Sequence, residues 1–274
     1  MLLRRAPFFA PFIALFAAGP ALADITIAGG SLDVALTAAD SLPPAPTAAG
    51  DLDACAHLFL TDPQTAGGQV ARAKGWLVTG EQALGDLTAV SFVADAYFVG
   101  SGACELTDGN VGFFQGNQLV ALLYGTDDEG LMIGWLRPFG TGLRVLTGDA
   151  LPSTAVDLSY DGATLTLSDP AEEEPVCNGA AIVPDIEGLP IDEARKVLDR
   201  AGWSPVPGDP AEQSFGMAEI IAGLGVPEVE GCSGTGFGFC AYGYQGSAGT
   251  LRVITAGEGG ESGGLPLVSS YDVA

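Results

Sequence analysis

Basic residues are scarce in this sequence. Lysine and arginine together number 10 against 34 aspartates and glutamates, which gives a formal net charge of −24 at pH 7. Lysine occurs only at Lys74 and Lys196. A charge of this sign repels nucleic-acid phosphates and anionic lipid, and it favours solubility. The composition therefore argues against DNA or RNA as a partner.

The sequence also lacks an apolar run of the length that spans a bilayer, which is about 20 residues. Its N-terminus has a basic start at Arg4 and Arg5, a short apolar run over Phe8–Leu15, and the small-residue sequence Ala21-Leu22-Ala23 before Asp24. This order is typical of a secretory signal peptide over residues 1–23. No cysteine follows the cleavage site, which disfavours a lipid anchor. We expect a periplasmic or secreted chain with no membrane attachment after cleavage.

Histidine is nearly absent, since His57 is the single one in the chain. A Ser-His-Asp triad would have to use it, and a zinc site would need further histidine or cysteine ligands nearby. We therefore predict no catalytic residue, no metal and no cofactor. A hydrolase that uses His57 or a carboxylate pair stays open as an alternative. An acidic chain supplies many such pairs by chance, so geometry is needed to choose one.

Five cysteines follow the signal peptide, and in an oxidising compartment disulfides are their default use. An odd number leaves one thiol free or joined to another chain. Cys232 and Cys240 are too far apart for a catalytic dithiol with two intervening residues, so we predict a disulfide between them. We predict a second disulfide between Cys55 and Cys104, with Cys177 as the free thiol. Pairing of Cys177 with Cys232 or Cys240 remains an alternative.

The N-terminal half of the chain has the pattern of a β domain. Residues 24–50 are rich in Ala, Pro and Gly, which predicts a flexible lead-in, although their first residues could add a strand. Residues 51–168 contain repeated short strand-like segments and no helical periodicity after Gly75. Asp161-Gly162, between AVDLSY and ATLTL, predicts a hairpin because both central residues of that turn need positive φ. We predict an antiparallel sandwich or small barrel.

An acidic linker is expected over residues 169–181, where SDPAEEEPVCNGAA changes the composition abruptly. A small α+β domain should then occupy residues 182–257, followed by a flexible tail over 258–274. Its helix has an apolar face over residues 191–201, with acidic residues in the first turn and Gly202 at the end. Three strands, Glu228–Gly231, Gly238–Tyr244 and Thr250–Ala256, should form a sheet under that single helix.

The segment VPDIEGLPIDEARKVLDRAGWSPV, residues 183–206, resembles the first half of a PASTA domain. The sequence after it, which contains CSGTGFGFC, departs from the pattern of that family. The resemblance implies a helix on a small three-stranded sheet, a place in the bacterial envelope, and recognition of peptidoglycan or β-lactams. The positions that match are Val183, Pro184, Asp185, Ile186, Gly188, Glu193, Ala194, Leu198, Ala201, Gly202 and Trp203.

We predict an aromatic binding surface in the C-terminal domain, formed by Trp203, Tyr242 and Tyr244. Alternation along the strand puts the two tyrosines on one face and Phe239 on the other. One of these faces must pack on the helix, and the other is free to bind. The function expected is that of an exported, non-catalytic protein that binds peptidoglycan or an envelope protein. A periplasmic hydrolase or an enzyme inhibitor that acts through the β domain is the alternative.

Overall fold

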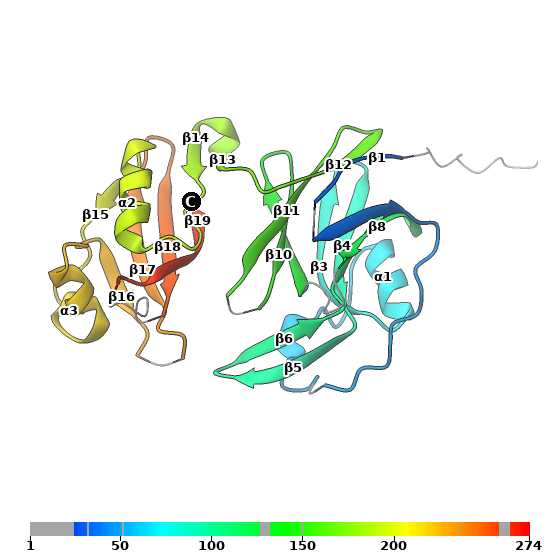
Figure 1. Ribbon diagram of the computed structural model, residues 1–274, viewed down its shortest axis with the longest axis horizontal. Coiled ribbons are helices and arrows are strands. Elements are labelled where there is room, and N and C mark those ends of the chain that lie inside the picture. The colour runs from blue at the N-terminus through cyan, green and yellow to red at the C-terminus, as the bar shows by residue number, and fades with distance from the viewer. Residues whose placement is uncertain are drawn as a thin grey trace, which may run out of the picture.

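The computed structural model describes residues 25–31, 33–50, 52–126, 132–149, 151–234, 236–257 and 264–274. The signal peptide expected over residues 1–23 lies outside the described residues. The chain forms a mainly β N-terminal domain and a small α+β C-terminal domain, as the sequence predicts (Figure 1). Among the described residues, no helix is both long and apolar enough to cross a membrane.

Two five-stranded sheets make up most of the N-terminal domain, with strand orders β1-β12-β11-β10-β9 and β2-β8-β7-β4-β3. Alternating apolar side chains from both sheets form one core, so the domain is a sandwich. A separate hairpin of β5 and β6 projects below it (Figure 1). The strands are β1 Thr26–Gly29, β2 Val34–Ala38, β3 Leu77–Leu84, β4 Leu87–Val93, β5 Asp95–Gly100, β6 Ala103–Thr107, β7 Asn110–Gln115, β8 Gln118–Gly125, β9 Ile133–Phe139, β10 Gly142–Thr147, β11 Ser153–Tyr160 and β12 Thr164–Ser168.

The hairpin predicted at Asp161-Gly162 joins β11 to β12. Gly162 has φ of 95°, which glycine adopts without strain. Asp161 is not among the described residues with positive φ, so the turn with two positive φ values that the sequence predicts is not the one formed. The Asp161 carboxylate accepts hydrogen bonds from the backbone N–H groups of Ala163 and Thr164, at 2.9 and 2.7 Å. These bonds hold the pKa of Asp161 below its usual value. The turn is therefore fixed by local chemistry that the sequence shows.

The lead-in over residues 24–50 is not a free segment, so that part of the sequence prediction is wrong. β1 pairs in parallel with β12, and β2 pairs with β8, so each adds an edge strand to a sheet. The proline-rich stretch packs as well: the Trp76 indole N–H donates to the Pro43 carbonyl at 2.9 Å, and Ala45 N–H donates to the Lys74 carbonyl at 2.8 Å. Open sheet edges and a large indole give this segment partners that composition does not reveal.

The N-terminal domain also contains helices, the short helix η1 over Ala56–Leu58 and α1 over Ala66–Ala73. Thr65 is the N-cap of α1, and its side chain accepts a hydrogen bond from Gly68 N–H at 3.0 Å. Helix α1 lies over β3, β4 and β7. The first residues of α1 are Ala66, Gly67 and Gly68, which carry no large apolar side chain, so the helix is hidden from a search for apolar periodicity.

The segment predicted as a solvated acidic linker is partly ordered and buried, contrary to expectation. Strand β13, Glu173–Val176, pairs with β14, Ala181–Pro184, around the short helix η2 over Cys177–Gly179. Glu174 is only 7% exposed because Arg137 of the N-terminal domain pairs with it. A run of three glutamates therefore contains one residue with an internal partner, and that partner is distant in sequence.

The C-terminal domain has more elements than the sequence predicts. Its sheet has the order β15-β17-β18-β19, with β16 also paired to β17, and a second helix, α3, accompanies α2. Residues 258–263 of the predicted flexible tail lie outside the described residues. The prediction is wrong for the rest of the tail, because β19 pairs with β18 and adds a strand to the sheet. The elements are α2 Ile191–Arg200, β15 Ser204–Val206, η3 Glu212–Ser214, α3 Gly216–Gly223, β16 Val229–Cys232, β17 Cys240–Gln245, β18 Thr250–Ala256 and β19 Leu267–Val273.

Candidate binding site at the domain junction

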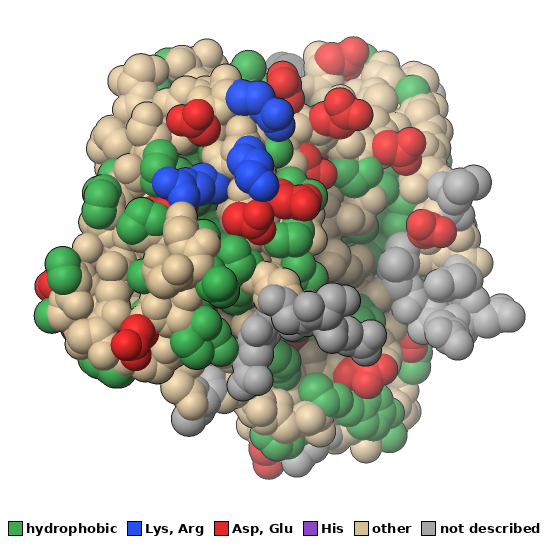
Figure 2. All heavy atoms as spheres, turned by 60° about the vertical axis from the view of Figure 1, so that its left-hand side comes forward, with side chains coloured by type: hydrophobic (Ala, Val, Ile, Leu, Met, Phe, Trp, Pro, Cys, Tyr) green, Lys and Arg blue, Asp and Glu red, His purple; other side chains and the backbone are tan. Residues whose placement is uncertain are grey.

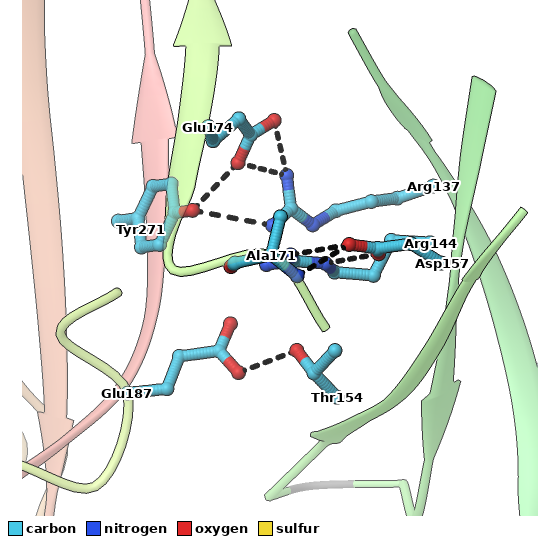
Figure 3. Close-up of polar contacts among 8 residues, drawn as sticks. All are labelled: Arg137, Arg144, Thr154, Asp157, Ala171, Glu174, Glu187 and Tyr271. Atoms are coloured by element: carbon cyan, nitrogen blue, oxygen red, sulfur yellow. Dashed lines mark hydrogen bonds and ion pairs between the residues drawn. The ribbon is translucent and has the colours of Figure 1, made fainter. Parts of the chain in front are cut away.

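Two arginines of the N-terminal domain, the buried Arg144 and the partly exposed Arg137, anchor the chain that leads to the C-terminal domain (Figure 3). Arg144 of β10 is 2% exposed and makes a two-point ion pair with Asp157 of β11, at 2.7 and 2.9 Å. Both side chains also bind the backbone of Ala171: Arg144 donates to its carbonyl at 3.2 Å, and Asp157 accepts from its N–H at 2.8 Å. The guanidinium lies 3.9 Å from the Phe139 ring centroid. The backbone N–H and the carbonyl of Ala171 are therefore both bound, and these bonds hold the connecting segment against the N-terminal domain.

The second arginine joins the two domains directly. Arg137 of β9 donates to both Glu174 oxygens at 2.7 Å and to the Tyr271 hydroxyl at 3.3 Å, and that hydroxyl donates to Glu174 at 2.6 Å (Figure 3). Burial, then the hydrogen bond to Glu174, raises the pKa of Tyr271 above its usual range. The tyrosine is therefore a neutral donor at physiological pH. Every member of this cluster has a partner, which suits a structural clamp.

A cleft of about 930 Å³ opens beside this clamp, and both domains line it. We call it the junction cleft. Glu187 of the C-terminal domain spans it at one point, accepting a hydrogen bond from the Thr154 hydroxyl of β11 at 2.8 Å (Figure 3). Clefts of this size hold small molecules in many proteins. The lining residues are Leu151, Pro152, Ser153, Thr154, Pro170, Asp185, Glu187, Gly188, Met217, Ser233, Gly234, Gly236, Phe237, Gly238, Ala256, Gly257, Leu267, Val268 and Ser269.

The charged side chains that line the junction cleft are acidic. Its charged lining residues are Asp185 and Glu187, and Lys and Arg are absent from the lining that the structure describes. Serine and threonine hydroxyls add hydrogen-bonding groups, while Met217 and Phe237 add apolar surface. The Phe237 ring packs 5.7 Å from the ring of Phe239. Such a lining favours a ligand with amino groups, hydroxyls and some apolar surface.

A second cleft, of about 970 Å³, lies on the Cys177 side of the junction. It contains Arg137 and Tyr271 of the clamp, together with the turn Cys177–Gly179. Cys177 and Asn178 have φ of 52° and 57°, in the left-handed region that residues with side chains seldom adopt. The Cys177 thiol is half-buried and free. The other four cysteines form the two disulfides expected, Cys55–Cys104 and Cys232–Cys240.

The predicted aromatic surface is not a surface, so this expectation is wrong. Trp203, Tyr242 and Tyr244 are each no more than 1% exposed and belong to the core of the C-terminal domain. Each polar group has an internal partner: Trp203 N–H donates to the Ile182 carbonyl at 2.8 Å, and Tyr244 donates to Glu228 at 3.0 Å. The two tyrosines do share one face, but it is the face that packs under the helices.

Burial also changes the acidity of these tyrosines. It raises the pKa of Tyr242 to about 12 and that of Tyr244 still further, where the nearby Glu228 charge adds to the effect. Neither hydroxyl ionises at physiological pH. Both tyrosines therefore stabilise the core, and the aromatic side chain that lines the junction cleft is Phe237, on the loop between β16 and β17.

The one histidine does not belong to a catalytic arrangement in the described residues. His57 is exposed on η1, next to the disulfide-bonded Cys55, and no carboxylate pairs with it in the described part of the chain. No group of three or more His, Cys, Asp or Glu side chains is close enough to hold a metal ion, again among the described residues. Comparison with family models, curated proteins and solved structures gives no match to this chain.

Sequence reasoning missed the residues of the junction cleft. Glu187 lies inside the segment quoted for the resemblance, but its partner Thr154 is 33 residues earlier in another domain. Nothing local in the sequence indicates that β11 and this turn meet. Phe237 carried a weak signal, because its glycine-rich, disulfide-closed loop is a place where an aromatic side chain can remain accessible.

Proposed function

We propose that this chain is an exported, non-catalytic envelope protein that binds its ligand in the junction cleft. The observation that supports this proposal is that the junction cleft, of about 930 Å³, is lined from both domains and combines acidic, hydroxyl and apolar side chains. The clamp of Arg137, Glu174 and Tyr271 holds those domains in a fixed relation, so the cleft is pre-formed. A pre-formed site spares the ligand the free-energy cost of ordering it.

The proposed location is the periplasm or the exterior. Two disulfides support it, because such bonds persist in oxidising compartments and are rare in the cytosol. The basic, apolar and small-residue order of residues 1–23 supports it from the sequence. In that location the material in reach includes peptidoglycan and other envelope proteins.

Peptidoglycan is the ligand that we propose first, with an envelope protein as the second candidate. The resemblance of residues 183–206 to a PASTA domain supports the choice, and most of the cleft lining belongs to this C-terminal domain. Peptidoglycan offers sugar hydroxyls and peptide amino groups. The former suit Thr154, Ser233 and Ser269, and the latter suit Asp185 and Glu187.

Co-sedimentation of the purified mature protein with peptidoglycan sacculi tests this function. We expect the wild-type protein in the pellet, and the Phe237→Ala and Glu187→Gln variants shifted towards the supernatant. Matched controls are Phe215→Ala and Glu219→Gln, which make the same changes at exposed positions on or beside α3. Protein that stays wholly in the supernatant would contradict wall binding. Pelleting that the cleft variants leave unchanged would contradict the assignment of the cleft.

A further inference from the structure

The hairpin of β5 and β6 ends in a cluster of exposed apolar side chains. Tyr97, Phe98 and Val99 are 42%, 49% and 60% exposed and follow one another in sequence. Tyr97 and Phe98 are neighbours on a strand and point to opposite faces, so both faces of the hairpin are uncovered here. Val99 lies at an irregularity in the pairing between Phe98 and Gly100. Figure 2 shows hydrophobic side chains at the lower end of the molecule, where Figure 1 places β5 and β6. We call Tyr97–Val99 and the turn after them the β5–β6 tip.

The β5–β6 tip has a defined conformation. Its turn residues Gly100, Ser101 and Gly102 all have positive φ, at 99°, 52° and 82°. A methyl group added at Gly100 or Gly102 would meet nothing within 4 Å, so open space surrounds the turn. A set of apolar side chains on a fixed, projecting turn loses little conformational entropy when it enters a pocket.

The base of the hairpin is fastened to the N-terminal domain on both strands. Cys104 of β6 is bound to Cys55 by a disulfide, and its N–H donates to the Asp149 carboxylate at 2.8 Å. Asp95 of β5 accepts hydrogen bonds from Gly50 N–H at 3.0 Å and from Ala96 N–H at 2.8 Å. Burial alone would raise the pKa of Asp95, but these backbone donors, together with a hydrogen bond from the Tyr97 hydroxyl, outweigh burial and lower it.

The two strands that carry the tip are acidic. β5 and β6 contain Asp95 and Glu105 and neither Lys nor Arg, and the whole chain has a net charge of −24. Glu105 lies opposite Tyr97 in the register of β5 and β6, and it is exposed. An anionic membrane would repel this region, and so would a second copy of the chain. A cationic partner surface would be attracted.

We propose that the β5–β6 tip docks into an apolar pocket on a partner protein whose rim carries Lys and Arg. Aromatic anchors that fill a pocket, surrounded by complementary charge, are the arrangement in which a few residues supply most of the binding free energy. Tyr97 and Phe98 are the anchors, and Glu105 meets the rim. None of these residues lines the junction cleft. An experiment can therefore contradict either the docking surface or the proposed cleft function and leave the other unaffected.

Site-specific photo-crosslinking in intact cells identifies the partner. The photoreactive residue p-benzoylphenylalanine replaces Phe98 in the full chain, and Leu224 in a control, since Leu224 is 62% exposed on the other domain. We expect a protein adduct from position 98 that position 224 does not give. Adducts with lipid, with a second copy of this chain, or with nothing at position 98 would each overturn the proposal.

Binding of the purified partner to the full chain then tests the chemistry. We expect Phe98→Ser to weaken the Kd about 30-fold, which is the effect of a hot spot of about 2 kcal/mol. Leu224→Ser should leave the Kd unchanged. Raising the salt concentration from about 0.05 to 0.5 M should slow association, because the rim contacts are electrostatic. Equal effects of the two variants, or salt-independent association, would overturn the proposal.

Discussion

Removal of the Arg144 side chain is expected to destabilise the protein more than removal of any exposed arginine. The guanidinium is 2% exposed, and its partner Asp157 has a side chain that is 9% exposed. Arg144→Leu leaves the Asp157 carboxylate buried without its counter-ion and removes the hydrogen bond to the Ala171 carbonyl. Breaking a buried ion pair in this way costs about 3–5 kcal/mol of the free energy of unfolding.

A matched exposed pair provides the control. Arg72 lies 3.6 Å from Asp62, and their side chains are 57% and 84% exposed. Arg72→Leu should therefore change the free energy of unfolding by no more than about 1 kcal/mol. The double variant Arg144→Leu/Asp157→Leu should regain part of the lost stability, because no charge is then buried alone.

Urea denaturation followed by tryptophan fluorescence measures these differences. Trp135 reports on the N-terminal domain and Trp203 on the C-terminal domain. Because Arg144 and Asp157 hold the connecting segment at Ala171, we also expect the variant to unfold in two separated transitions. A loss for Arg144→Leu that matches the loss for Arg72→Leu would refute the argument that this buried pair anchors the junction.

Two further predictions concern the disulfides and the base of the β5–β6 hairpin. By loop-closure entropy, replacing Cys55 and Cys104 by Ser should cost about 4 kcal/mol and replacing Cys232 and Cys240 about 2–3 kcal/mol, measured by calorimetry, because the first pair is 49 residues apart and the second 8. Equal losses would contradict that ranking. Asp95→Asn should cost about 1–3 kcal/mol at pH 7. The lowered pKa of Asp95 means that its contribution is present above the unfolded pKa near 4 and is lost as pH falls through the folded pKa, so the difference in stability between variant and wild type should shrink as the pH is lowered below about 4.

The sequence was sufficient where structure depends on neighbouring residues. Alternation and the Asp161-Gly162 turn predicted the β11–β12 hairpin, and apolar spacing predicted α2 within the C-terminal domain. The Cys232–Cys240 pair followed from close spacing in an exported chain, and the Cys55–Cys104 pair from the presence of both cysteines in the first domain, although other pairings of Cys177 were left open. The hairpin, the helix and the Cys232–Cys240 pair depend on residues close in sequence, so pattern alone is informative there.

The sequence was insufficient where partners are far apart. Glu174 resembled a solvated residue of an acidic run, yet Arg137 and Tyr271 bury it from 37 residues before and 97 residues after. The tyrosine face of β17 had the correct alternation, but alternation does not say which of two faces a helix covers. Tyr242 and Tyr244 were therefore assigned to a surface and lie in the core.

The same limit applies to the candidate site. The junction cleft exists because β11 and the turn at Glu187 are brought together by the clamp, and no local motif indicates that contact. The β5–β6 tip is similar: YFV reads as an ordinary strand, and only the structure shows that both of its faces are uncovered. Binding surfaces of this kind are products of tertiary arrangement.

Export is the claim on which the assignment to the envelope rests, and one intact-mass measurement tests it directly. The protein is purified without reductant from the cells that make it, then unfolded and treated with iodoacetamide. We expect a chain that begins at Asp24, carries one alkylated thiol and retains two disulfides. A chain that begins at Met1 with all five cysteines alkylated would contradict export.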